Sequence, residues 1–346
     1  MLRKLTYGAI PGSEELRSNI ARNLYSSGAS KFPSENVLIT TGAIAANFLL
    51  MYSLVGPGDH VICVFPTYQQ LYSVPESFGA EVSLWRLQEH KNYVPDVEEL
   101  KGLIKPNTKL IVLNNPNNPT GSTTPRSVLE KVVDIAKSRD IIILCDEVYR
   151  PLFHSLPPTD PEAPPSILSM GYHKVIATGS LSKAFALAGI RVGWIASRDP
   201  SIIEACIKAR DYTTISVSQL DDQVASFALS PGVIHNLLSR NMELAKTNLV
   251  ILDEFVSKFS KTCSWIRPTA GTTAFVKFQK DGRAVDDQAF CKAVLDKTGV
   301  LLVPGDKCFG VAKGDFEGCV RIGYAGETEE LVGALKLLEE FLETDF

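Results

Sequence analysis

Short apolar runs rich in β-branched residues recur along the chain, with helical stretches between them. The runs at 110–113 and 141–144 are apolar at every position, which is typical of strands that are covered on both faces. The pattern therefore predicts an α/β fold with a mostly parallel central sheet of about seven strands and helices on both faces. The expected strands are residues 37–41, 60–65, 82–87, 110–114, 141–145, 175–178 and 194–196.

A different pattern begins near Ile234, where a long amphipathic helix is expected. Mixed strand and helix segments follow it, and the last helical pattern lies at 331–341. A chain of 346 residues is long enough for two cores. We expect a large domain at 8–233, a smaller α+β domain at 234–346 and an N-terminal arm at 1–7. The proline-rich stretch 151–165 is expected to be a surface loop.

Charge and composition exclude several classes of protein. The net charge of -4 and the absence of a basic run give no basis for binding nucleic acid. No apolar run approaches the ~20 residues that cross a bilayer, and the N-terminus lacks a signal-peptide core. The seven cysteines have no CxxC spacing, which argues against a disulfide framework and against a zinc site. We expect a cytoplasmic enzyme with no metal and no membrane partner.

Polar residues follow several of the expected strands. In open parallel sheets, ligands bind outside the carboxyl ends of the strands, where loops and helix N-termini converge. Three such ends are followed by segments that contain Asn118, Asp146 and Ser180. We expect these segments to line one site.

Lys183 follows a strand end and precedes small residues and glycines, which suits a buried amine that forms an imine. The alternative is a solvated loop lysine. Arg191 stands eight residues later in an apolar run, where an unpaired cation is costly unless it meets an anion. A cofactor phosphate is such an anion, and Ser180 offers it a hydroxyl.

Asp146 ends a buried strand, and its carboxylate needs a partner there. A helix N-cap or an ion pair is one possibility, and a pyridinium nitrogen is the other, with Tyr149 close enough to reach the ring hydroxyl. The turn at 115–121 places Asn118 as a candidate donor to the cofactor, although it satisfies the rules for a turn alone. Gly42, Ala43 and Ile44 open a helix whose amides could hold phosphate, as many helices do.

These segments together resemble the class I and II aminotransferase family, which has the type I fold of pyridoxal-phosphate enzymes, across nearly the whole chain. The resemblance lies in the NPTG-like turn at 118–121, the DExY motif at 146–149 and the SxSKxxxxxGxRxGW motif at 180–194. It implies pyridoxal 5'-phosphate as the cofactor, a small amino acid as the substrate and transamination as the reaction.

The resemblance also implies a role for each matching residue. Lys183 is the Schiff-base lysine and proton shuttle, Asp146 meets the ring nitrogen, and Asn118 and Tyr149 meet the ring hydroxyl. The other cofactor-binding residues are Gly42, Ala43, Ile44, Ser180, Ser182 and Arg191 around the phosphate, Tyr68 stacked on the ring and Tyr7 reaching a neighbouring subunit's phosphate.

Substrate and subunit contacts are implied by the same resemblance. Arg321, with Asn118, is expected to bind the substrate carboxylate, and Tyr7 implies a homodimer with shared active sites. Residues 213–216 match the place of a further phosphate hydroxyl. From sequence alone, Tyr68 could equally be a core tyrosine and Arg321 an edge-strand arginine.

The reaction stays open at this point. The segments 146–154 and 210–218 look more like the capreomycidine-synthase and arginine-oxidase branch, which dehydrates, cyclises or oxidises arginine-type substrates. Only six residues precede Tyr7, so either the chain is a shortened form or its lid segment differs. Three hypotheses remain: an aminotransferase, a cyclase, lyase or oxidase acting on an arginine-like amino acid, and a non-catalytic relative with the same fold.

Overall fold

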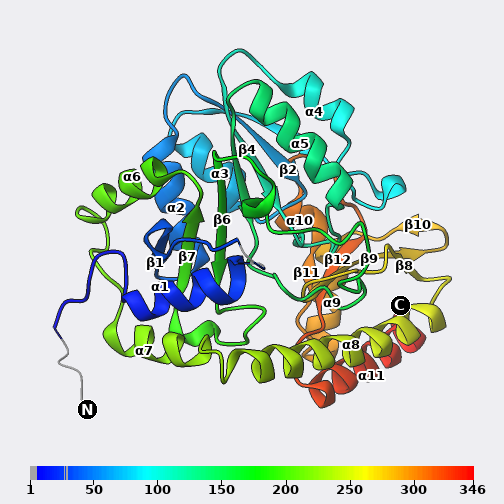
Figure 1. Cartoon of the computed structure of the whole chain (residues 1–346). Coiled ribbons are helices and arrows are strands. Elements are labelled where there is room, and N and C mark those ends of the chain that lie inside the picture. The colour runs from blue at the N-terminus through cyan, green and yellow to red at the C-terminus, as the bar shows by residue number, and fades with distance from the viewer. Residues whose placement is uncertain (1–5, 27, 29) are drawn as a thin grey trace.

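The computed structural model describes residues 6–26, 28 and 30–346, and it contains two β-sheets (Figure 1). The larger sheet has seven strands in the order β1-β7-β6-β5-β4-β2-β3. β7 is antiparallel to both neighbours and the other strands are parallel to one another. The strands are β1 Val37–Thr40, β2 His60–Phe65, β3 Glu81–Arg86, β4 Thr108–Asn114, β5 Ile142–Asp146, β6 Val175–Ser180 and β7 Gly193–Ser197.

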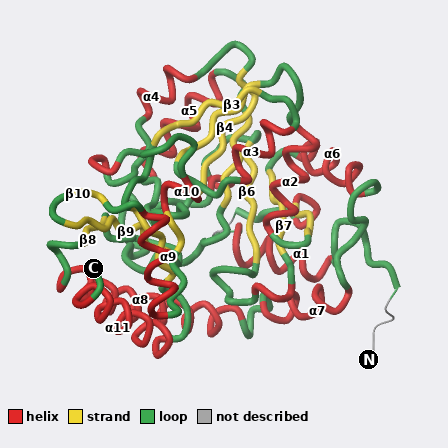
Figure 2. Tube along the Cα trace, turned by 180° about the vertical axis from the view of Figure 1, so that it is seen from behind, coloured by secondary structure: helices red, strands yellow, loops and turns green. Residues whose placement is uncertain are grey.

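Helices cover both faces of this sheet, as Figure 2 shows from behind. Successive residues of β2 illustrate why the strands are apolar throughout: Val61 and Cys63 point into one core, and Ile62 and Val64 into the other. One core is closed by α2, α3 and α6, and the other by α1 and α5. The helices around this sheet are α1 Glu14–Ile20, α2 Ala43–Leu54, α3 Gln70–Ser77, α4 Val97–Leu103, α5 Arg126–Ser138, α6 Pro200–Arg210 and α7 Gln219–Ala228.

The smaller sheet is antiparallel and lies toward the C-terminal end of the chain. Its order is β10-β9-β12-β11, with β8 also paired to β9. Its apolar residues pack against the long helices α8 and α11 to form a separate core. The elements are α8 Ile234–Lys258, β8 Cys263–Trp265, β9 Thr273–Lys280, β10 Arg283–Ala284, α9 Asp287–Thr298, β11 Val303–Pro304, α10 Gly305–Phe309, β12 Cys319–Gly323 and α11 Thr328–Thr344.

The predicted fold class is confirmed: a seven-stranded, mostly parallel sheet between helices, with a smaller domain built on an antiparallel sheet. α8 begins at Ile234, where the long helix was expected, but the division of the chain at residue 234 stays a prediction. Of the expected N-terminal arm, residues 1–5 lie outside the described residues. All of residues 151–165 are described, and they form neither helix nor strand. No helix within the described ranges has the length and apolarity to cross a membrane.

Candidate active site

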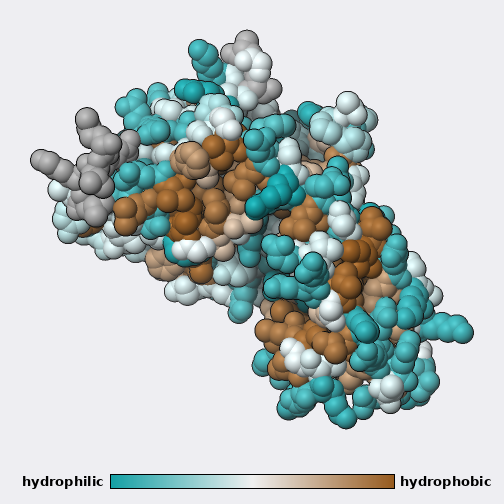
Figure 3. All heavy atoms as spheres, turned by 90° about the horizontal axis from the view of Figure 1, so that it is seen from below, coloured by the Kyte–Doolittle hydropathy of each residue, from teal (hydrophilic) through white to brown (hydrophobic). Residues whose placement is uncertain are grey.

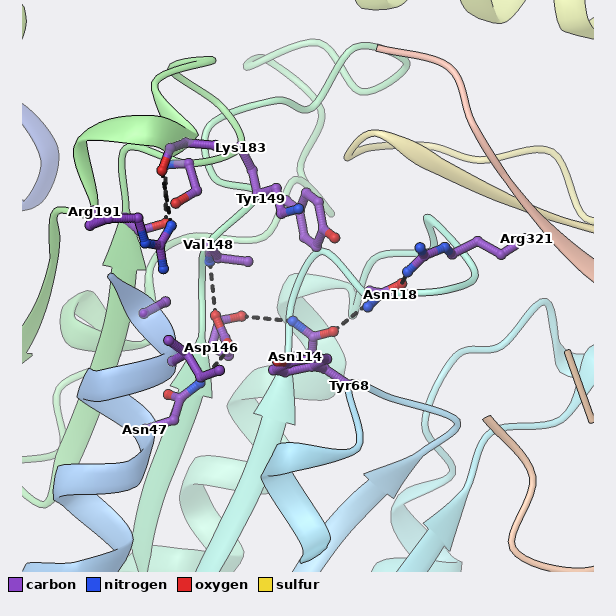
Figure 4. Close-up of a pocket in the computed structure, with 15 residues that line it drawn as sticks. Asn47, Tyr68, Asn114, Asn118, Asp146, Val148, Tyr149, Lys183, Arg191 and Arg321 are labelled. Atoms are coloured by element: carbon purple, nitrogen blue, oxygen red, sulfur yellow. Dashed lines mark hydrogen bonds between the residues drawn. The ribbon is translucent and has the colours of Figure 1, made fainter. Parts of the chain in front are cut away.

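A pocket of about 280 Å³ opens at the carboxyl ends of the parallel strands (Figure 4). β4, β5 and β6 end at Asn114, Asp146 and Ser180, and all three residues line it. The remaining wall comes from the first two turns of α2 and from the loops after β2, β4, β5 and β6, and β12 of the smaller sheet adds Arg321. Residues distant in sequence therefore meet at one place because parallel strands end on the same edge of the sheet. The lining residues are Ala43, Ile44, Asn47, Tyr68, Asn114, Asn118, Asp146, Val148, Tyr149, Ser180, Ser182, Lys183, Ala188, Arg191 and Arg321.

One end of the pocket is built to receive an anion. Gly42 caps α2 with φ 84°, a conformation that favours glycine, and no side chain caps the free amides of the first turn. A Cβ on Gly42 would lie 2.6 Å from Nη2 of Arg191, so only glycine lets the guanidinium approach this turn. Gly193 has the same role on β7, since its Cβ would lie 2.5 Å from the amide nitrogen of Ala43. The N-terminus of α2 and the Arg191 guanidinium therefore meet at this end of the pocket, where both favour an anion.

Lys183 and Arg191 lie near each other at this end, as Figure 4 shows. The Arg191 side chain donates a 2.9 Å hydrogen bond from Nη1 to the carbonyl of Ala188, which holds it beside the loop. Partial removal from water lowers the pKa of Lys183, and the positive charges of Arg321 and Arg191 lower it further, against the opposing effect of Asp146. In the single chain Lys183 is an exposed residue, not the buried amine that its sequence context suggested. Its lowered pKa still favours the neutral, nucleophilic form.

The Asp146 carboxylate is almost completely buried and receives a donor on each oxygen. Its Oδ1 accepts from the backbone amide of Val148 at 3.1 Å, and its Oδ2 accepts from Nδ2 of Asn47 at 3.0 Å. Burial raises the pKa of Asp146, and these two hydrogen bonds together with Lys183 oppose the rise. No arginine or lysine pairs with it within hydrogen-bonding distance among the described residues. Its position suits a cationic ring nitrogen.

At the opposite side of the pocket, residues from the two sheets meet. Arg321, on β12, donates from Nη1 to the side-chain oxygen of Asn118 at 3.2 Å. Asn118 is held in turn by Asn114, whose side-chain oxygen accepts from the backbone amide of Asn118 at 2.8 Å. The Arg321 guanidinium also lies over the ring of Phe309, 5.5 Å from its centroid. In Figure 4 Arg321 and Arg191 lie at opposite sides of the view, with Asp146 between and below them.

Two tyrosines complete the lining. Tyr149 is buried, and this burial raises its pKa to about 12 while the positive charge of Arg321 opposes the rise. Its hydroxyl is therefore protonated and able to donate at neutral pH. Tyr68 is partly exposed, at 39%, and lines the pocket rather than a core, which removes the core-tyrosine alternative.

The donor set fits a phosphorylated pyridine. Of the described residues that line the pocket, three are cationic and one is a carboxylate: Lys183, Arg191 and Arg321 against Asp146. This excess of positive charge suits a ligand with a phosphate and a substrate with a carboxylate, and the turn at Gly42 is a cradle that any Cβ would obstruct. The residues present therefore suit pyridoxal 5'-phosphate.

Most of the predicted site residues line this one pocket, and Gly42 shapes it from behind. Tyr7 does not line it: its side chain is 86% exposed and borders a separate surface hollow with residues 216–220. Residues 213–216 are also absent from the lining, and the hydroxyl of Thr213 donates to the Ala209 carbonyl instead. Tyr7 was expected at the phosphate of a neighbouring subunit, so its role stays a prediction, as does that of residues 213–216.

The sequence interpretation missed four lining residues: Asn47, Asn114, Val148 and Ala188. Asn47 carried a signal, because it is the only strongly polar side chain in the first two turns of an otherwise apolar helix. Asn114 carried another, as the last residue of a buried strand at the ligand-binding edge. Val148 and Ala188 have no distinctive side chains, so only the fold places them.

Comparison with known proteins gives matches along nearly the whole chain. The family model for aminotransferase class I and II matches residues 3–336. The chain is 30% identical to capreomycidine synthase of Streptomyces vinaceus over 96% of this chain and 80% of that protein. It is 29% identical to aspartate aminotransferase of Thermotoga maritima over 96% of this chain and 82% of the other. The crystal structure of a PLP-dependent aminotransferase from Streptococcus suis superposes with a TM-score of 0.88 at 41% identity, covering 99% of this chain and 84% of the other.

Proposed function

Because the chain belongs to the class I and II aminotransferase family, we propose that it transfers the amino group of a small amino acid, with Lys183 as the cofactor-binding lysine. The family assignment makes it a pyridoxal-phosphate-dependent, aminotransferase-like enzyme and favours an enzyme over a non-catalytic relative. The observation that best supports the role of Lys183 is its convergence with Asp146 and Arg191 on one pocket of about 280 Å³.

Different pocket residues are assigned to different parts of the cofactor. Bound here, pyridoxal phosphate supplies an electron-withdrawing ring that stabilises negative charge at the substrate α-carbon. We assign the phosphate to Arg191, Ser180, Ser182 and the amides of Ala43 and Ile44. With the cofactor bound, Asp146 would meet the ring nitrogen, Asn118 and Tyr149 would donate to the ring hydroxyl, and Tyr68 would cover a ring face.

Lys183 and Arg321 act on the substrate. Arg321 presents a planar fork of donors to the α-carboxylate, which fixes how the α-carbon lies in the pocket. The lowered pKa of Lys183 makes its neutral amine available to take the α-proton and to return a proton later. Orientation and proton transfer are thus supplied by side chains from two sheets.

A second candidate is a cyclase or a related reaction on an arginine-like amino acid. Two observations favour it: the identity of 30% with capreomycidine synthase, and the segments 146–154 and 210–218. Both candidates share the proton abstraction by Lys183 and differ in the fate of the substrate after that step. A screen of amino acids that includes arginine and hydroxyarginine separates them, because a keto acid formed without release of ammonia identifies transamination, while ammonia or a cyclised product identifies the alternative.

The role of Lys183 is tested by reduction with borohydride. The purified protein should be yellow, and borohydride should bleach it and leave the cofactor attached to Lys183, located by mass spectrometry. Lys183→Ala should show no such attachment and should lose at least about a thousandfold in activity. Lys208→Ala, an exposed lysine on α6 paired with Glu204, is the matched control and should behave as the natural protein. Attachment at another lysine would overturn the assignment.

We also propose a homodimer with shared active sites. Three apolar side chains on α7 are exposed in the single chain: Leu220 at 60%, Val224 at 45% and Phe227 at 68%. Hydrophobic residues gather over this region in Figure 3. Such a patch is typical of an interface, and a partner would bring its own Tyr7 arm. Sedimentation velocity should give twice the mass of one chain, and Phe227→Glu should shift the protein toward monomer.

The cytoplasmic location stays a prediction.

A further inference from the structure

We propose that Asn47 is a positioning residue, which with Thr178 holds the Asp146 carboxylate ready for the ring nitrogen of the cofactor. The inference rests on the proposed function, since it takes Asp146 as the partner of that nitrogen. It concerns a residue outside the three motifs that carry the family resemblance.

Asn47 links one helix to two strands of the large sheet. It lies in α2, 1% exposed, in a helix whose other buried residues are apolar. Its Nδ2 donates to Oδ2 of Asp146 at the end of β5, at 3.0 Å. Its Oδ1 accepts from the hydroxyl of Thr178 on β6, at 2.9 Å. Thr178 is fully buried, so this hydroxyl has no access to water.

The polarity of this chain of hydrogen bonds is fixed by chemistry. An ionised carboxylate only accepts, so the Asn47 amide must turn its NH₂ group toward Asp146. The amide oxygen then faces Thr178, whose hydroxyl is the donor. By donating to this oxygen, Thr178 stabilises the amide orientation that a charged Asp146 requires.

The remaining amide hydrogen of Asn47 also has an acceptor. Oε1 of Gln70 lies 3.5 Å from Nδ2, and Gln70 is itself fixed by donating to the Ile44 carbonyl at 2.7 Å. With the Val148 amide on the other carboxylate oxygen, both oxygens of Asp146 are held and the carboxylate plane is fixed. The hydrogen bond from Asn47 is also the largest of the influences that oppose the rise of the Asp146 pKa on burial.

A positioning role predicts an effect confined to the ring nitrogen. Without the Asn47 amide, one carboxylate oxygen loses its donor, and the buried group is free to rotate and protonates more easily. The residues assigned above to the phosphate, the aldehyde and the ring hydroxyl do not include Asn47. The affinity for a cofactor analogue with carbon in place of the ring nitrogen should therefore not depend on Asn47.

The test compares the dissociation constants of pyridoxal 5'-phosphate and of this analogue for the same protein stripped of cofactor. The natural protein should prefer pyridoxal phosphate. In Asn47→Leu the ratio of the two affinities should fall by roughly tenfold, as expected for the weakening of one charge-assisted hydrogen bond. Thr178→Val should lower the ratio in the same direction, and Thr178→Ser, which keeps the hydroxyl, should restore it.

Asn19→Leu is the matched control. Asn19 is also a buried helical asparagine, and its Nδ2 donates to the Ser226 carbonyl at 3.0 Å, away from the pocket. Its loss should lower the stability of the protein without changing the affinity ratio. Equal weakening of both ligands in Asn47→Leu and Thr178→Val would make Asn47 a purely structural residue and overturn the proposal. If Asn47→Leu does not fold, Thr178→Val decides alone.

Asp146→Ala separates this proposal from the function on which it rests. If the affinity ratio falls strongly in Asp146→Ala but does not change in the Asn47 and Thr178 variants, the positioning role is wrong and the proposed function stands. No change in Asp146→Ala means that the ring nitrogen lies elsewhere, and the assignment of the cofactor site fails.

Discussion

Arg321 and Asn118 join the two sheets inside the pocket, through a 3.2 Å hydrogen bond from the guanidinium to the amide oxygen. The bond leaves the rest of the guanidinium fork facing the cavity, where it lines the wall with Tyr149 and Lys183. It also fixes the amide of Asn118 so that its NH₂ group points elsewhere than at Arg321. One contact thus orients a residue assigned to the substrate and a residue assigned to the cofactor.

Arg321→Lys should reduce kcat/KM about a hundredfold, because an ammonium cannot replace two parallel hydrogen bonds to a carboxylate, a loss of roughly 3 kcal/mol. The cofactor spectrum should not change. The corresponding amine, which lacks the carboxylate, should react equally poorly with both forms of the enzyme. Arg267→Lys, at an exposed arginine paired with Asp253, is the control. A carboxylate substrate that reacts equally well with Arg321→Lys would contradict the assignment.

Gly42→Ala should destabilise the protein and weaken cofactor binding together. Gly42 has φ 84°, and an added Cβ would lie 2.6 Å from Nη2 of Arg191, so both backbone strain and displacement of the guanidinium are expected. We expect a loss of roughly 1 to 3 kcal/mol in the free energy of unfolding, measured with denaturant.

Gly102→Ala is the matched control for this substitution. Gly102 lies in α4 with a negative φ and with nothing within 4 Å of an added Cβ, so alanine should be neutral or stabilising by up to about 1 kcal/mol. If the two alanine variants had the same stability and the same cofactor affinity, Gly42 would have no special role.

Local sequence signals predicted much of the fold and of the site. Fully apolar runs identified the buried parallel strands, since a strand covered on both faces cannot alternate with polar residues. A carboxylate at the end of one buried strand and a lysine just after another stand out against the apolar residues before them. Asp146 and Lys183 were therefore predicted as site residues. The antiparallel direction of β7 was not specified by its sequence, because a short apolar strand fits either direction.

The residues that were missed depend on packing between distant elements. Asn47 reaches Asp146 only because α2 packs against β6 and β7, which brings together two residues that are 99 positions apart. Nothing in the local sequence of α2 states which strand it will cover. The role of Tyr7 stays a prediction, because its expected contact belongs to a second chain.

His154 makes the stability of the protein sensitive to acid. It is buried, and Nε2 lies 2.7 Å from the Tyr324 hydroxyl, a contact between the loop after β5 and the segment after β12. Burial lowers its pKa to about 4, and the positive charge of Arg267 adds to this effect. The folded protein therefore prefers the neutral imidazole, and the stability it contributes is present above the ordinary pKa of 6.5.

This contribution should be lost as the pH falls from about 6.5 to about 4, and the full loss is roughly 3 kcal/mol. His154→Gln, which does not titrate, should reduce the slope of unfolding free energy against pH in that interval. His235→Gln, at an exposed histidine on α8, should leave the slope unchanged. The same slope in His154→Gln and in the natural protein would show that other groups cause the acid sensitivity.

Ile44→Thr should improve the phosphate site. Ile44 is the second residue of α2 and lines the pocket, where its side chain is 47% exposed and brings no donor to the end that holds Arg191. Threonine keeps the β-branched shape and adds a hydroxyl beside the free amides of the first turn. One added hydrogen bond of about 1 kcal/mol should tighten binding of pyridoxal 5'-phosphate roughly fivefold. Pyridoxal without its phosphate should bind as before, and Ile44→Val, with the same branching and no hydroxyl, should show no gain. If threonine and valine had the same affinity for the phosphorylated cofactor, the phosphate could not lie against this turn of α2, and the assignment of Arg191 and the Ala43 and Ile44 amides would have to be withdrawn.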